Sequence, residues 1–184
     1  MMKEILEPTT ALAPVPVVMI SCGNMENANI TTVAWTGILN SNPPLVYVAI
    51  RPQRHSYNII KETNEFVINI PDEKLVYHVD YCGTKSGKDE DKFETAELTK
   101  IESTKVKAPS IKECPINLEC KVIEVKAYQS HHVFIAEVIS VSVNKGLVDS
   151  KGKIKYLDGN LLTYLGNEYI VANNKVAERG ICLK

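Results

Sequence analysis

Short apolar runs separated by turn residues fill the first part of the chain, a pattern typical of β-strands. One run covers Pro14 to Ser21 and ends at the turn residues Cys22-Gly23-Asn24. A second run, Ile30 to Trp35, is rich in β-branched residues and predicts another strand. After the chain break at Pro43-Pro44, residues Leu45 to Ile50 predict a third.

Two helices are predicted among these early strands. The first begins near Ser56 and ends at about Thr63, and it is followed by a strand over Glu65 to Ile70. Asp72 can cap the second helix. The apolar side of that helix carries Leu75, Val76 and Val79.

Two long strands are predicted in the second half. Apolar residues fall on even positions from Ile116 to Val122 and on odd positions from Ile123 to Ala127. A change of phase by one residue inside a strand predicts a β-bulge. The next strand covers about Val133 to Val143, and Lys153 to Leu157 predicts a last short strand. Many strands with few helices favour a closed or sandwiched antiparallel sheet over a parallel Rossmann sheet.

Composition narrows the class of protein. A chain of 184 residues suits one domain spanning residues 1–184, and a net charge of -1 gives no support for nucleic-acid binding. No apolar run is long enough to span a membrane. Acidic residues stand where a signal peptide would have its apolar core, so we expect a cytoplasmic protein. The five cysteines are scattered without a Cys-x-x-Cys pair, which predicts reduced thiols and no metal site.

The corner after Ile50 is the clearest candidate for binding chemistry. Arg51 and Arg54 follow the strand, and Ser56 stands where the helix would begin. A helix start presents unpaired backbone N–H groups, and arginine adds charge-assisted hydrogen bonds, so both accept phosphate. The alternative is two solvated arginines before an ordinary helix start.

Three other segments carry polar groups. Asn29, Thr31, Thr32 and Thr36 flank the only tryptophan, Trp35, and could present donors to a flat heterocycle, or form an ordinary Thr-rich strand. Between Cys82 and Phe93, glycines at 83 and 87 allow close approach to a ligand. Ser86 and Asp89 there have the spacing of a helix cap, although a polar surface loop would look similar.

The third segment is Ser130-His131-His132, between the two long strands. Neighbouring histidines in an extended chain point to opposite faces, so they cannot share one metal ion. One of them could transfer a proton at the edge of a pocket, or lie exposed in a hairpin turn.

Together these segments resemble the flavin reductase-like, FMN-binding split-barrel family, which includes flavoredoxins and two-component flavin reductases. The resemblance covers about residues 14–165. Its matches are the strand from Asn29 to Trp35, the corner from Ile50 to Ser56, the segment from Ser86 to Phe93, and the strand from His131 to Val138. Ala136 replaces a glycine of the family pattern, and Ser130 stands where an aspartate is common.

The resemblance implies roles for individual residues. The isoalloxazine and ribityl chain of FMN would contact Thr31, Thr32, Ala34 and Trp35, and Asn29 is a further cofactor-binding candidate. The phosphate would be held by Arg51, Arg54 and Ser56, and the site would be completed by Ser86, Gly87 and Lys92. Lys92, a neighbouring lysine or backbone N–H groups could stabilise the reduced ring, and His131 is the candidate catalytic residue.

The resemblance further implies a mainly β fold, an antiparallel Greek-key split β-barrel of six strands with a few flanking helices, and a homodimer. The leading functional hypothesis is an NAD(P)H-dependent flavin reductase that passes electrons to free flavin, iron or a redox protein. The alternatives are a flavoredoxin-type electron carrier reduced by a partner protein, and a non-redox protein that binds another flat ligand. No separate nicotinamide motif distinguishes them.

Overall fold

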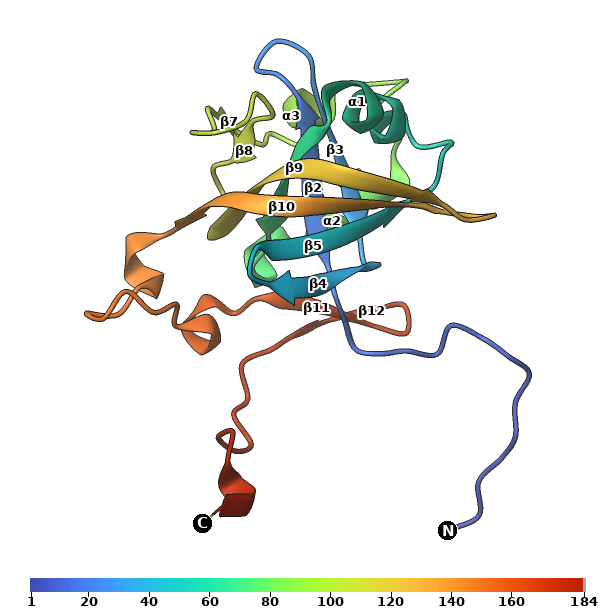
Figure 1. Ribbon diagram of the computed structural model, residues 1–184, viewed down its shortest axis with the longest axis vertical. Helices are drawn as coiled ribbons and strands as arrows, with labels where there is room; N and C mark the ends of the chain where they lie inside the picture. The colour runs from blue at the N-terminus through green and yellow to red at the C-terminus, as the bar shows by residue number, and fades with distance from the viewer. Residues whose placement is uncertain (184) are drawn as a thin grey trace.

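The computed structural model describes residues 1–183, and a strongly curled antiparallel sheet forms its centre (Figure 1). The strand order in this sheet is β3-β2-β6-β9-β10-β5-β4. The strands are β2 (Val18–Gly23), β3 (Ala28–Val33), β4 (Thr36–Ser41), β5 (Pro44–Ile50), β6 (Glu65–Ile70), β9 (Ile116–Ala127) and β10 (His132–Val143). The mainly β, antiparallel split-barrel prediction is therefore confirmed, with seven strands in the central sheet rather than six.

The curled sheet stays open between its two edges. β3 and β4 are the edge strands, and the bend between them carries Ala34 and Trp35. The carbonyl of Trp35 accepts a hydrogen bond from the N–H of Ala49 in β5, at 2.9 Å. This contact brings the end of β3 beside β5, so residues from both strands reach the same side of the barrel.

Three α-helices and two small sheets surround the barrel. The helices are α1 (His55–Thr63), α2 (Val76–Thr84) and α3 (Lys92–Thr95). One small sheet joins β1 (Val15–Pro16), β11 (Leu162–Leu165) and β12 (Glu168–Val171), and the other pairs β7 (Lys100–Ile101) with β8 (Ser110–Ile111). The 3₁₀ helices are η1 (Glu73–Leu75), η2 (Lys145–Leu147), η3 (Tyr156–Gly159) and η4 (Ile181–Leu183).

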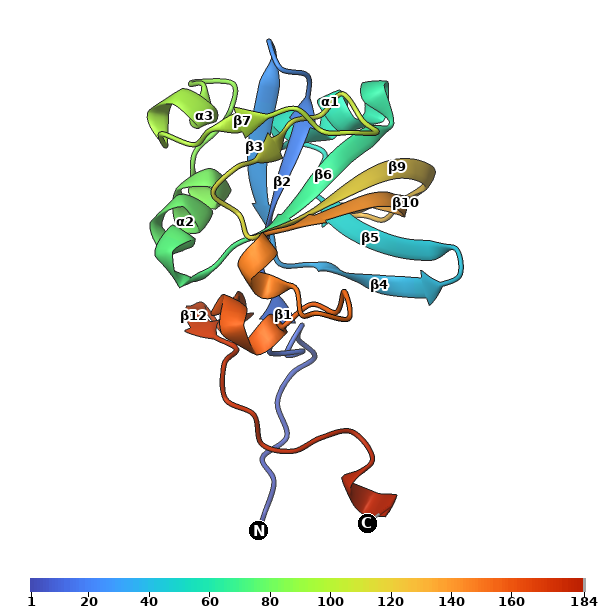
Figure 2. The same ribbon diagram turned by 90° about the vertical axis from the view of Figure 1, so that its left-hand side faces the viewer.

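The strand β2 is buried on both faces, which explains its continuous apolar sequence. Ile20 belongs to the core inside the barrel, together with Tyr57 and Ile60 of α1. Met19 belongs to a second core, which includes Val79 of α2. Figure 2 shows α2 and α3 on one side of the sheet and α1 near its upper end. Packing in the two cores holds α1 and α2 against the sheet. The candidate site lies where these helices contact the sheet.

Several sequence predictions are confirmed at the level of single residues. Ile135 pairs with Glu124 and Ala136 pairs with Val122, which leaves Ile123 as the bulged residue. The strand Glu65–Ile70 has the predicted bounds, and α1 ends at Thr63 as predicted. Asp72 caps η1, where its side chain accepts a hydrogen bond from the N–H of Lys74, and α2 continues from there.

Other predictions about local structure are wrong. Lys153 to Leu157 is not a strand, because only Ile154 forms an isolated bridge, to Val148, and the chain turns into η3 at Tyr156. Ser86 does not cap a helix, since α3 starts at Lys92 and Asp91 accepts hydrogen bonds from its first N–H groups. The strands β4, β11 and β12 were not predicted.

The two ends of the chain leave the compact part of the molecule. Residues 1–14 and 172–183 extend away from the sheet on the side of β11 and β12 (Figures 1 and 2). Among the described residues, no helix has the length and apolar character needed to cross a membrane.

Candidate functional site

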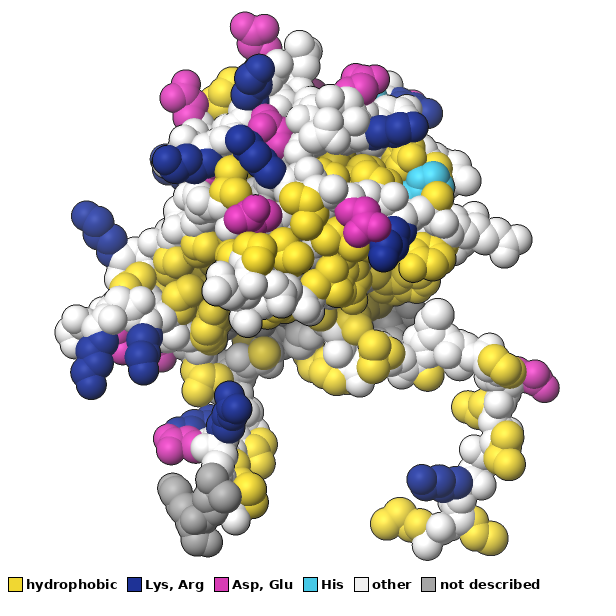
Figure 3. Space-filling view, viewed as in Figure 1, with side chains coloured by type: hydrophobic (Ala, Val, Ile, Leu, Met, Phe, Trp, Pro, Cys, Tyr) yellow, Lys and Arg dark blue, Asp and Glu magenta, His cyan; other side chains and the backbone are white. Residues whose placement is uncertain are grey.

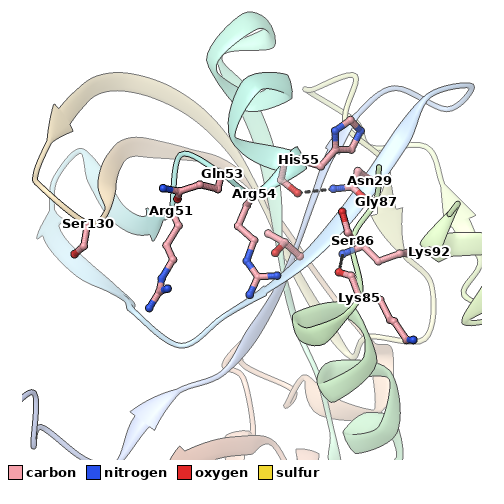
Figure 4. Close-up of a pocket in the computed structure, with 12 residues that line it drawn as sticks. Asn29, Arg51, Gln53, Arg54, His55, Lys85, Ser86, Gly87, Lys92 and Ser130 are labelled. Atoms are coloured by element: carbon pink, nitrogen blue, oxygen red, sulfur yellow. Dashed lines mark hydrogen bonds between the residues drawn. The ribbon is translucent and has the colours of Figure 1, made fainter. Parts of the chain in front are cut away.

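Two adjoining cavities lie at the corner between β5 and α1. The first, of about 500 Å³, contains Arg54, Ser56 and the loop after α2 (Figure 4). The second, of about 550 Å³, contains Trp35 and His131. Thr31, Arg51 and Arg54 line both cavities, so the two form one continuous site. Every residue proposed from the sequence lines at least one of them: Asn29, Thr31, Thr32, Ala34, Trp35, Arg51, Arg54, Ser56, Ser86, Gly87, Lys92 and His131.

The helix start in the first cavity is open to a ligand. The helix α1 begins at His55, one residue earlier than predicted, and its N-cap residue Arg54 has extended backbone. No side chain caps this end of the nine-residue helix. Its first N–H groups are therefore free of the side-chain partner that usually satisfies them, and they carry partial positive charge. Together with the two arginines, this geometry suits an anion such as a phosphate group.

Ser56 is held in place by a contact that the sequence does not reveal. Its Oγ accepts a hydrogen bond from Nδ2 of Asn29 at 2.6 Å, and both side chains are buried. Gly87 packs directly against the same asparagine, because a Cβ at this position would lie 2.0 Å from Oδ1 of Asn29. The strand β3, the helix α1 and the loop after α2 are thus joined at one point of the first cavity.

Lys92 lines the first cavity but directs its ammonium group to the backbone. Its Nζ donates hydrogen bonds to the carbonyl oxygens of Cys82 and Lys85, at 2.9 and 3.2 Å. Burial lowers the pKa of Lys92, and the charge of Arg54 acts in the same direction. A cation at the carboxyl end of α2 is favourable, because unpaired carbonyl groups and the helix dipole place negative charge there. Lys92 therefore orders the loop that carries Ser86 and Gly87.

Aromatic side chains form one part of the second cavity. The rings of Trp35 and His131 lie 4.3 Å apart, and Trp35 is 44% exposed. The hydroxyl proton of Thr32 is not available to a ligand, because the hydroxyl donates a hydrogen bond to the carbonyl oxygen of Val79 at 2.5 Å. A partly exposed tryptophan beside an open cavity offers a flat apolar surface on which a heterocycle can stack.

His131 occupies the hairpin between β9 and β10. Its Nε2 accepts a hydrogen bond from Nε of Arg51 at 3.4 Å, and its Nδ1 lies 3.0 Å from Oγ of Ser130. Burial lowers the pKa of His131, and so does the charge of Arg51. The imidazole is therefore neutral at pH 7, with its proton on Nδ1, since Arg51 donates to Nε2.

His132 points away from this site, as expected for the neighbouring residue in an extended chain. Its Nδ1 lies 2.7 Å from the hydroxyl oxygen of Tyr57, inside the packed region around α1. The two histidines thus do not share a ligand. Within residues 1–183, no group of three His, Cys, Asp or Glu side chains is arranged to hold a metal ion.

Several lining residues were missed in the sequence. The first cavity also contains Gln53, His55 and Lys85, and the second contains Asp80, Tyr164, Asn167 and Tyr169. Ser130, from the segment singled out in the sequence, lines the first cavity as well. Gln53 and His55 belong to the predicted corner and could have been included with it. The residues of the second set come from α2 and the β11–β12 hairpin, which meet only in the folded chain.

Comparison with known proteins gives a consistent result. Residues 10–169 match the family described as flavin reductase like domain. An uncharacterized protein of Archaeoglobus fulgidus is 38% identical over 156 residues, covering 85% of this chain and 88% of the relative. An uncharacterized protein of Pyrococcus abyssi is 31% identical over 173 residues, covering 93% of this chain and 98% of the relative.

Two solved structures of flavoredoxins have the same fold as this chain. The flavoredoxin of Desulfovibrio vulgaris (Miyazaki F) superposes with a TM-score of 0.92 at 30% identity, and the alignment covers 100% of both chains. The flavoredoxin of Methanosarcina acetivorans gives a TM-score of 0.89 at 26% identity, also with 100% of both chains covered.

Proposed function

The chain belongs to the flavin reductase like family, and from this premise we propose that it binds FMN across the two adjoining cavities. The observation that carries the proposal is the chemistry of the first cavity, which is lined by the uncapped start of α1 together with Arg51 and Arg54. Such a place takes a phosphate group, which FMN has and riboflavin lacks. The flavoredoxins that share the whole fold support a flavin as the cofactor.

The second cavity suits the ring of the same molecule. Trp35 supplies a flat surface, and Thr31 and Thr32 of β3 with Ala34 of the following bend line the same cavity. A bound flavin supplies the transfer of electrons, while the protein supplies binding, orientation and local charge. In this arrangement Lys92 orders the loop beside the site, and His131 presents a neutral imidazole at the edge of the ring cavity.

We further propose that the protein is an NAD(P)H-dependent flavin reductase whose electrons pass to free flavin, iron or a redox protein. The partial exposure of Trp35 in the second cavity supports this, because a second flat molecule can approach the ring position from solvent. The alternative is an electron carrier reduced by a partner protein. The similarity to two flavoredoxins over the entire chain favours that second candidate.

Rapid mixing distinguishes the reductase from the carrier. If the protein is a reductase, anaerobic mixing of the FMN-loaded protein with NADH or NADPH should bleach the flavin absorbance within seconds, without a partner protein. The measurement is stopped-flow absorbance, with reduced ferredoxin as the parallel donor. A flavin that stays oxidised with both nicotinamides but is reduced by ferredoxin would support the carrier.

A homodimer is part of the proposal. Exposed apolar side chains gather on β4, β9 and β10, and Figure 3 shows a broad hydrophobic band across this face. The residues of this apolar patch are Ile38, Leu39, Ile123, Val125 and Val141, of which Ile38 is 84% exposed. A contiguous patch of this kind is typical of an interface between protein chains.

Light scattering tests the dimer. The parent protein is expected to have twice the chain mass of 20.5 kDa, and Ile38→Asp should shift it toward the monomer because a charge would be buried at the interface. Leu157→Asp serves as the matched control, since Leu157 is exposed and lies outside the apolar patch. A parent protein that is monomeric at every concentration would contradict the proposal.

A further inference from the structure

The second cavity has an acidic side chain where α2 and the β11–β12 hairpin line it, and arginine side chains near the corner between β5 and α1. It contains Asp80 of α2 together with Tyr164 and Tyr169 of the hairpin. The hydroxyl of Tyr169 donates a hydrogen bond to Oδ1 of Asp80 at 3.1 Å, and Tyr164 donates to Asn167 at 3.0 Å. The carboxylate is thereby fixed at the cavity by one oxygen, while Oδ2 makes no hydrogen bond to the described residues.

Three Asp, Glu, Lys or Arg side chains line the second cavity: Arg51, Arg54 and Asp80. Arg51 and Arg54 also line the first cavity, where the proposed phosphate would lie. Asp80 lines the second cavity but not the first. A phosphate monoester carries between one and two negative charges at pH 7, so its binding neutralises the two arginines. Asp80 then remains as the uncompensated charge of the cavity that receives the ring.

We propose that Asp80, held by Tyr169, makes this cavity selective by charge for the second ligand that enters beside the flavin ring. Flat molecules with a positive charge or an N–H donor are favoured there, and molecules with a carboxylate, sulfonate or phosphate at that end are disfavoured. The inference rests on the proposed function, because it requires a flavin phosphate at the arginines.

The burial of Tyr169 agrees with a fixed pair. Burial raises the pKa of Tyr169 to about 12, and the hydrogen bond and charge of Asp80 act in the same direction. The tyrosine therefore remains a neutral hydrogen-bond donor over the whole physiological pH range, and it holds the carboxylate without adding a charge of its own. Asp80 itself is exposed at the cavity rim, so a ligand can reach Oδ2 from solvent.

Three flat ligands of nearly equal shape test the selectivity. Benzamidinium, benzamide and benzoate carry positive, zero and negative charge on the same ring. Each is titrated into the oxidised, FMN-loaded protein, and binding is followed by the change in the flavin absorbance spectrum. Benzamidinium should bind most tightly, benzamide less tightly and benzoate most weakly. The Asp80 carboxylate attracts only the positively charged ligand and repels only the negatively charged one.

Asp80→Asn keeps the shape of the side chain and removes its charge. It should weaken benzamidinium binding and strengthen benzoate binding, each by about five-fold at low salt, and leave benzamide nearly unchanged. High salt should reduce both shifts, since the carboxylate is exposed. Tyr169→Phe keeps the charge and should retain the order of affinities, but with smaller differences between the ligands, because the carboxylate is no longer held at the cavity.

Asp149→Asn is the matched control, because Asp149 lines neither cavity and its substitution changes the net charge equally. Equal shifts for all three ligands in Asp80→Asn would overturn the inference, and so would a parent protein that binds benzoate as tightly as benzamidinium. A loaded protein whose spectrum responds to none of the ligands would overturn it as well. A protein that takes up no flavin fails the proposed function, and this inference falls with it.

Discussion

Replacing Arg54 by Ala is expected to weaken FMN binding by about ten- to a hundred-fold. Arg54 is the N-cap residue of α1 and lines both cavities, so its side chain borders the cavity that contains the open helix start. A hydrogen bond to a charged group contributes roughly 1.5–3 kcal/mol, which corresponds to that range of dissociation constants. Arg51→Ala should have a smaller effect, because Nε of Arg51 already donates to His131.

Riboflavin provides the control ligand, since it has the same ring without the phosphate. Titrations followed by flavin fluorescence should show that riboflavin binds the parent and Arg54→Ala nearly alike. Arg179→Ala is the matched control variant, because the third arginine of the chain lies outside both cavities. Equal losses for FMN and riboflavin would show that Arg54 supports the structure of the site rather than the phosphate.

The corner could be predicted because its residues are consecutive. A strand that ends at Ile50, two arginines and a helix start follow one another within a few positions, so local sequence contains the whole arrangement. The bulge at Ile123 was predictable for a similar reason, since a change in the alternation of apolar residues is visible within one strand. The number of strands and turns indicated a closed or sandwiched antiparallel sheet, and the family resemblance narrowed this to a split barrel.

The second cavity could be predicted only in part. Trp35 and the threonines of β3 are local, whereas Asp80 and Tyr169 are far apart in sequence and meet through packing of α2 against the hairpin. The hairpin itself had a sequence signal that was missed. Gly166 and Asn167 both have positive φ and form a two-residue turn between β11 and β12.

The role of Lys92 shows a different limit of sequence reasoning. Its position in the family pattern predicts a residue of the flavin site, and it does line the first cavity. The direction of its ammonium group depends on the end of α2, which presents the carbonyls of Cys82 and Lys85. The capping error arose because Ser86 accepts a hydrogen bond from the N–H of Lys88 in a turn, whereas Asp91 accepts from the N–H of Phe93 at the helix start.

The substitution Gly87→Ala tests whether the joint between Gly87, Asn29 and Ser56 organises the first cavity. The added Cβ would lie 2.0 Å from Oδ1 of Asn29, so the asparagine or the loop must move. Asn29 cannot move freely, because it is 4% exposed and its Nδ2 donates to Ser56. Loss of this buried hydrogen bond and displacement of Ser56 should weaken FMN binding by about ten- to a hundred-fold.

A double-mutant cycle separates this steric effect from general damage to the protein. In an Asn29→Ala background the space next to Gly87 is open, so adding Gly87→Ala should cost little further affinity for FMN. Gly146→Ala is the matched control, because no atom lies within 4 Å of a Cβ built there and FMN binding should not change. Additive losses in the cycle would mean that Gly87 acts independently of Asn29. The loop after α2 would then contact the ligand directly instead of positioning the side chains that hold it.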